Sequence, residues 1–101
     1  MATPSNEGAA VRALIRAVRA DGWVMTVVDD GGDEDEIIPV RTEGEALEAI
    51  FAVDEAYLYF TRSGERAWIR FVLGNEPEEV ACDYTVNLSD AIDPVTDKWW
   101  S

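Results

Sequence analysis

Hydrophobic and polar positions alternate along this chain in short segments, each with the period of a helix or a strand. Four apolar residues recur at the i, i+3, i+4, i+7 spacing of one helix face: Val11, Leu14, Ile15 and Val18. Gly22 follows them as a stop signal. The pattern predicts a first helix that begins at Ala9, after a flexible polar lead-in of residues 1–8.

Five further segments are apolar, β-branched or aromatic, which is typical of β-strands. They cover residues 23–28, 37–40, 57–62, 67–73 and 80–86. Pro39 has no N–H group to donate to a neighbour, so we expect the second strand at a sheet edge. Ser63-Gly64-Glu65 predicts a hairpin turn, and Gly74-Asn75-Glu76-Pro77 predicts a second turn.

Two sequence signals indicate further helices. Thr42-Glu43-Gly44-Glu45 matches a capping box and predicts a helix that runs to about residue 53. Asp93-Pro94 matches an N-cap followed by proline, and predicts a short final helix. The order α-β-β-α-β-β-β, with this last helix, predicts an α+β fold. We expect one domain over residues 9–101: a mainly antiparallel sheet of about five strands, with two or three helices on one face.

The composition limits where this chain works. Of its 101 residues, 48% are hydrophobic, enough for one core. The single cysteine, Cys82, excludes an intramolecular disulfide and fits a reducing cytoplasm. It stands mid-strand, where a buried inert thiol is expected. The start of the chain does not have the pattern of a secretory signal, and no apolar stretch approaches 18 residues, so we expect a cytoplasmic protein without a membrane partner.

Acidic residues dominate the charge of the chain, which is -13 in total, and histidine is absent. Six of the eight residues between strands 23–28 and 37–40 are carboxylates: Asp29, Asp30, Asp33, Glu34, Asp35 and Glu36. This charge repels nucleic acids and anionic membranes. It favours a protein partner with a basic surface, for which these six residues are the candidate binding residues, as surrogate anions.

Metal binding, solubility and nucleic-acid mimicry are alternative roles for the acidic segment. It does not place oxygen ligands, glycine and glutamate at the EF-hand positions, so we expect no dedicated metal site. Plain solubility or adaptation to a salty cytoplasm would also produce such acidity. Mimicry of a nucleic-acid backbone would require the carboxylates to gather on one surface.

Catalysis finds little support in the sequence. Without histidine the usual general base near neutral pH is absent, and nothing activates Cys82 as a nucleophile. Gly31-Gly32 is too short to hold a phosphate group, and no Lys-Ser/Thr follows it. We therefore expect a protein that is not an enzyme, with no catalytic residues and no cofactor.

Trp99 and Trp100 are candidate interface residues near the end of the chain. Two adjacent side chains on a regular element do not both point inward. An exposed tryptophan favours an interface, and a second copy of this chain would serve as the partner as well as a foreign protein would.

The second half of the chain resembles a group of small uncharacterised acidic proteins of proteobacterial phages, prophages and plasmids. The resemblance rests on a strand, a Gly-Asn-x-Pro-x-Glu-Val turn and an Asp-Tyr-Thr-x-Asn ending, which here lie within residues 68–88. Ala67 replaces a glycine of that pattern, and Arg70 interrupts its apolar strand. The resemblance implies no activity and no site residues, but such proteins are often accessory binders that block host machinery.

Three functional hypotheses follow. The first is an accessory inhibitor from a phage or mobile element, which occupies a basic, nucleic-acid-binding surface of a host protein. The second is a small structural or homo-oligomeric protein whose acidity serves solvation or salt adaptation. The third is an immunity protein for a cationic toxin.

Overall fold

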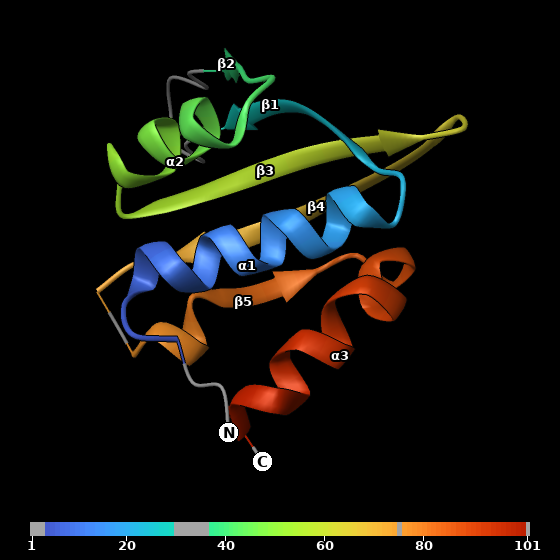
Figure 1. The fold of residues 1–101 in the computed structure, drawn as a ribbon. Helices are drawn as coiled ribbons and strands as arrows, with labels where there is room; N and C mark the ends of the chain where they lie inside the picture. The colour runs from blue at the N-terminus through green and yellow to red at the C-terminus, as the bar shows by residue number, and fades with distance from the viewer. Residues whose placement is uncertain (1–3, 30–36, 75, 101) are drawn as a thin grey trace.

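Three helices cover one face of a five-stranded antiparallel sheet in the computed structural model of the chain (Figure 1). The structure describes residues 4–29, 37–74 and 76–100. Its helices are α1 (Glu7–Ala20), α2 (Glu43–Phe51) and α3 (Ser89–Trp100). Its strands are β1 (Val24–Asp29), β2 (Ile37–Pro39), β3 (Glu55–Arg62), β4 (Glu65–Val72) and β5 (Ala81–Tyr84). The short 3₁₀ helices η1 (Pro77–Glu79) and η2 (Val86–Leu88) flank β5. The α+β fold predicted from the sequence is confirmed.

The strands follow the order β2-β1-β3-β4-β5, and every neighbouring pair is antiparallel. The hairpin of β3 and β4 is the longest pairing and runs from Glu55↔Val72 to Arg62↔Glu65. Its turn requires two residues in the left-handed region, and Ser63 (φ 48°) and Gly64 (φ 83°) occupy it. The predicted edge position of the strand that contains Pro39 is confirmed.

The core lies between the sheet and the helices. Alternate residues of β3 and β4 point toward the helices and are buried: Ala56, Leu58, Phe60, Ala67, Ile69 and Phe71. The predicted stripe of α1 is buried against them, and the described residues contain no buried polar or charged side chain. None of the helices in the described part of the chain lies over the opposite face of the sheet (Figure 1).

Helix α1 begins two residues before the predicted start. The Asn6 carboxamide oxygen accepts a hydrogen bond of 2.8 Å from the backbone N–H of Ala9, which caps the helix. The Glu7 carboxylate also accepts from the backbone N–H of Gly74, at 2.9 Å. Glu7 and Gly8, which the prediction assigned to the lead-in, therefore belong to α1.

The predicted start of the last helix at Asp93-Pro94 is wrong, because α3 begins at Ser89 and contains Pro94 in its interior. Leu88, Ile92 and Trp99 are buried at helical spacing on both sides of the proline. Pro94 has no N–H group, so one hydrogen bond to the preceding turn of the helix is missing. Burial of the apolar stripe outweighs this loss.

The fifth strand is shorter than the predicted range 80–86, and Cys82 is exposed where a buried thiol was expected. The pairing register shifts between Arg70↔Asp83 and Phe71↔Ala81, so Cys82 lies in a bulge. A bulge breaks the strict alternation on which the prediction of burial relied.

Candidate functional site

The acidic segment predicted as the binding site lies almost entirely outside the described residues. Asp30, Asp33, Glu34, Asp35 and Glu36 belong to the range 30–36. Asp29 closes β1, where it is paired with Ile37 of β2 and Tyr57 of β3. A binding site on this segment therefore stays a prediction.

Of the two tryptophans at the end of α3, the structure describes the side chain of Trp99. Trp99 has only 6% of its surface exposed and packs in the core. A role of Trp99 in an interface stays a prediction. The side chain of Trp100 is not among those that the structure describes.

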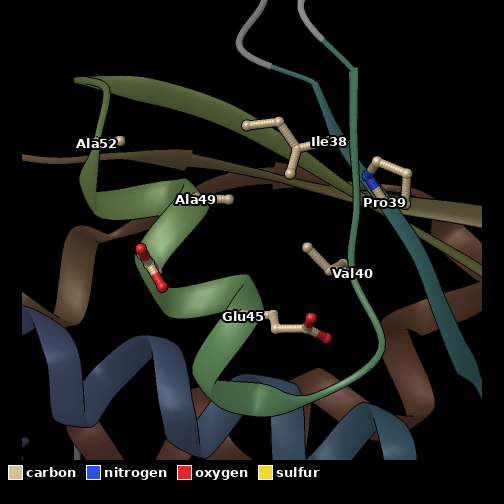
Figure 2. Close-up of a pocket in the computed structure, with 7 residues that line it drawn as sticks. Ile38, Pro39, Val40, Glu45, Ala49 and Ala52 are labelled. Atoms are coloured by element: carbon tan, nitrogen blue, oxygen red, sulfur yellow. The ribbon is translucent and has the colours of Figure 1, made fainter.

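A shallow groove separates β2 from α2 and has a volume of about 340 Å³. We call it the β2–α2 groove; its lining residues are Ile38, Pro39, Val40, Glu45, Glu48, Ala49 and Ala52. Figure 2 shows Ile38 and Val40 on the strand side and Ala49 and Ala52 on the helix side, pointing toward the same space. The small alanine side chains leave this space open.

Strand β2 lines the groove with Ile38 and Pro39 but offers an incomplete backbone edge. The N–H of Val40 donates to the carbonyl oxygen of Thr26 in β1, at 3.1 Å. Because donors alternate along a strand, the nitrogen of Pro39 lies on the outer side. That nitrogen carries no hydrogen, so another strand would find a donor missing there. Contacts in the groove are therefore better made by side chains than by strand addition.

The charged residues of the groove are both acidic. Glu45 also forms the capping box of α2, where its carboxylate accepts from the backbone N–H groups of Arg41 (3.0 Å) and Thr42 (3.1 Å). These hydrogen bonds, that from Arg41 first, lower the pKa of Glu45. Glu48 is exposed one turn further along the helix. Both charged side chains that line the groove are therefore carboxylates.

The acidic residues of α2 divide between two surfaces. The carboxylate of Glu43 bridges α2 to α1, with Arg12 at 2.7 Å and Arg16 at 2.9 Å. The hydrogen bond from Arg16 is the main cause that lowers the pKa of Glu43. Glu43 is thereby neutralised by the arginines of α1, whereas Glu45 and Glu48 remain at the groove.

A second surface lies on the sheet face opposite the helices. We call it the open face and define it by Tyr57, Tyr59, Arg66, Trp68, Arg70 and Asp83. The first five alternate with the buried residues of β3 and β4, and Asp83 of β5 is paired with Arg70. The ring of Tyr57 lies 5.5 Å from that of Trp68, edge to face, and 6.4 Å from that of Tyr59. A hollow of about 270 Å³ beside Tyr59 and Arg66 continues this surface toward β1.

A metal centre and a membrane-spanning helix are both absent from residues 4–29, 37–74 and 76–100. No three His, Cys, Asp or Glu side chains there gather as metal ligands. Over the same ranges, no helix has the length and apolar character needed to cross a membrane.

Comparison with known proteins gives no relative from which a function could be transferred: no family model, curated protein or solved structure matches this chain. The resemblance to phage-type proteins stays a prediction. The function of this protein must therefore be inferred from the β2–α2 groove and the open face.

Sequence reasoning missed both surfaces, although each left a signal. Ile37-Ile38-Pro39 is an apolar run at a predicted edge strand, which suggests an uncovered apolar surface. Tyr57, Tyr59 and Trp68 occupy alternate positions on two strands joined by a hairpin, so they share one face. Which side the helices would cover was not readable from either pattern.

Proposed function

We propose that this protein acts by binding, and that the β2–α2 groove docks a basic, amphipathic segment of a partner protein. The observation that carries the proposal is an apolar groove whose charged residues, Glu45 and Glu48, are both carboxylates. Catalysis plays no part in this function.

The apolar part of the groove supplies a contact surface. Ile38 is 39% exposed beside the small side chains of Ala49 and Ala52, so apolar side chains of a partner would remove further hydrophobic surface from water. This is the arrangement by which grooves receive the apolar face of an amphipathic segment.

The charge of the groove selects the polar part of the partner. Lysine or arginine side chains beside Glu45 and Glu48 would form ion pairs at the rim, which favour correct over incorrect partners more than they add affinity. In the sequence, the six carboxylates from Asp29 to Glu36 directly precede β2. The chain total of -13 would also speed encounters with a basic protein.

The more specific form of the proposal is an inhibitor that occupies a nucleic-acid-binding surface. Such surfaces are rich in lysine and arginine, and a chain of charge -13 complements them. Exchange of Asp33, Glu34, Asp35 and Glu36 for their amides is expected to abolish binding to that surface and leave the fold intact. Binding that survives this exchange at ordinary salt would contradict this form.

The groove is tested with a synthetic amphipathic peptide of alternating leucine and lysine pairs, titrated into ¹⁵N-labelled protein and followed by NMR. We expect shifts of the amide signals of Ile38, Val40 and Ala49, and weaker binding in Glu48→Lys by about tenfold. Shifts confined to other surfaces would overturn the proposal.

The matched control is Glu79→Lys, which makes the same change of charge on η1. Loss of binding in both variants to the same extent would mean that the peptide responds only to total charge. An acidic peptide of alternating leucine and glutamate pairs is expected not to bind.

A further inference from the structure

We propose that the hollow between β1 and β3 binds a small organic acid, with a single carboxylate carried on an apolar or aromatic body. This hollow has a volume of about 270 Å³ and is lined by Thr26, Val27, Tyr59, Phe60, Thr61 and Arg66. We call it the β1–β3 hollow. Its lining residues differ from those of the β2–α2 groove, so the two proposals are independent.

A bulge in β1 shapes the β1–β3 hollow. The pairing register of β1 and β3 shifts between Met25 and Val28. Two residues of β1, Thr26 and Val27, thus lie opposite one residue of β3, Tyr59. The hydroxyl group of Thr26 donates to the carbonyl oxygen of Tyr59 at 3.2 Å, which holds the strands together across the bulge. Bulges bend a strand and are common beside active sites. All three residues of the bulge line the hollow.

Arg66 is the charged residue among those that line the hollow. It is exposed, and none of the ion pairs among the described residues includes it. The other two arginines of the β3–β4 hairpin, Arg62 and Arg70, are paired with Asp21 and Glu55, each at 2.9 Å. A guanidinium presents N–H donors in a planar fork that matches the two oxygens of a carboxylate. The charge of the hollow therefore fits a ligand with a carboxylate.

The uncharged residues of the lining select what carries that carboxylate. Val27 and Tyr59 are only partly buried, so an apolar or aromatic group placed against them would remove further hydrophobic surface from water. Thr61 lies opposite Arg66 in the hairpin, which places a hydroxyl group beside the guanidinium. The volume of about 270 Å³ is just below the range of roughly 300–1,000 Å³ that is typical of pockets for drug-sized ligands, so the ligand is small.

The total charge of the chain limits the ligand to one negative charge. A polyanion such as a nucleic acid is repelled by a chain of charge -13, and a single guanidinium does not offset that repulsion. A cation is attracted by the whole chain but meets the positive charge of Arg66 in the hollow. A monocarboxylate is the ligand whose charge is paired locally and whose repulsion by the rest of the chain is smallest.

The hollow is tested with 3-phenylpropanoate, titrated into ¹⁵N-labelled protein and followed by NMR. We expect saturable shifts of the amide signals of Thr26, Val27, Thr61 and Arg66, with a Kd of about 1 mM or below. The uncharged analogue 3-phenylpropanamide is expected to bind at least about tenfold more weakly, because it does not pair with the guanidinium. Shifts confined to other surfaces, or equal binding of the amide, would overturn the proposal. So would the absence of saturable shifts up to about 10 mM.

Arg66→Gln is the variant that removes the proposed partner of the carboxylate. It is expected to weaken binding of 3-phenylpropanoate by about tenfold or more. The matched control is Arg19→Gln, which makes the same change of charge at an exposed position of α1. It is expected to leave binding unchanged. Equal weakening by both variants, or by neither, would contradict a site at Arg66. Circular dichroism establishes that each variant is folded.

Two further probes test the selection by charge and by shape. Inorganic phosphate lacks an apolar body, and 3-phenylpropylammonium carries the opposite charge, so neither is expected to shift the signals of the hollow. Binding of either one there as tightly as 3-phenylpropanoate would overturn the assignment to a monocarboxylate. Glu48→Lys, which weakens peptide binding to the β2–α2 groove, is expected to leave binding in the hollow unchanged, so the two proposals fail separately.

Discussion

At the scale of residues, two side-chain contacts fix positions that strand and helix patterns leave open. The guanidinium of Arg62 lies 4.4 Å from the ring centre of Trp23 and bonds the Asp21 carboxylate at 2.9 Å. The phenol of Tyr84 donates to the Asp93 carboxylate at 2.6 Å, which joins β5 to α3. Both contacts join different elements of the fold, so no local sequence pattern predicts them.

The Tyr84–Asp93 hydrogen bond predicts a loss of stability at alkaline pH. This bond, together with burial, raises the pKa of Tyr84 from 10.0 to about 12. A folded-state pKa above the unfolded value means that the folded protein holds the proton more tightly. The contribution of this hydrogen bond to the stability of the fold is therefore complete below pH 10.0 and is lost as the pH rises through about 12. Denaturant unfolding measured at several pH values checks this.

The variant that tests this bond is Tyr84→Phe. It should lower the free energy of unfolding by about 1 kcal/mol near neutral pH, since it removes one hydrogen bond to a charged group. The difference from the parent protein should shrink above pH 10.0, where the tyrosine of the unfolded parent begins to ionise while the folded parent still holds the proton. A difference that is constant with pH would contradict the assignment.

At the scale of elements, the sequence signals for the ends of helices differed in how well they predicted the structure. The capping box at Thr42 and the stop at Gly22 were predicted from local sequence and are present, because each is satisfied within a few residues. The start of α3 was predicted wrongly, because the local preference at Asp93-Pro94 competes with burial of Leu88 and Ile92 against the rest of the fold. Local signals were reliable only where no tertiary contact opposed them.

Pro94 supplies a prediction for α3. Its ring removes one backbone donor inside the helix and crowds the carbonyl group of the preceding turn. Pro94→Ala is therefore expected to raise the free energy of unfolding by about 1 kcal/mol or more. Denaturant unfolding followed by circular dichroism measures this, and a variant less stable than the parent would count against an interior position of Pro94.

At the scale of the whole molecule, the balance between net charge and hydrophobic burial decides stability. A charge of -13 without histidine opposes compaction through repulsion, while 22 buried hydrophobic side chains among the described residues favour it. Arg12 and Arg16 of α1 relieve this repulsion locally, through their ion pairs with Glu43.

Salt dependence of stability tests this balance. Addition of sodium chloride to a low-salt solution is expected to raise the melting temperature steadily, because the Debye length shortens and repulsion is screened. Differential scanning calorimetry measures the effect. A requirement for molar salt to fold at all would favour the salt-adapted interpretation of the acidity, and stability that falls with salt would contradict net repulsion.

The sequence by itself determined the type and order of the elements, the edge position of Pro39 and the total charge. These follow from period, backbone chemistry and composition, which are properties of short segments or of simple sums. Only the tertiary structure decided which face of the sheet the helices cover, and therefore that Tyr59 and Trp68 are left on the open face. It also decided that Glu43 is paired while Glu45 and Glu48 line the groove. Such facts depend on contacts between segments far apart in the chain, which no local pattern specifies.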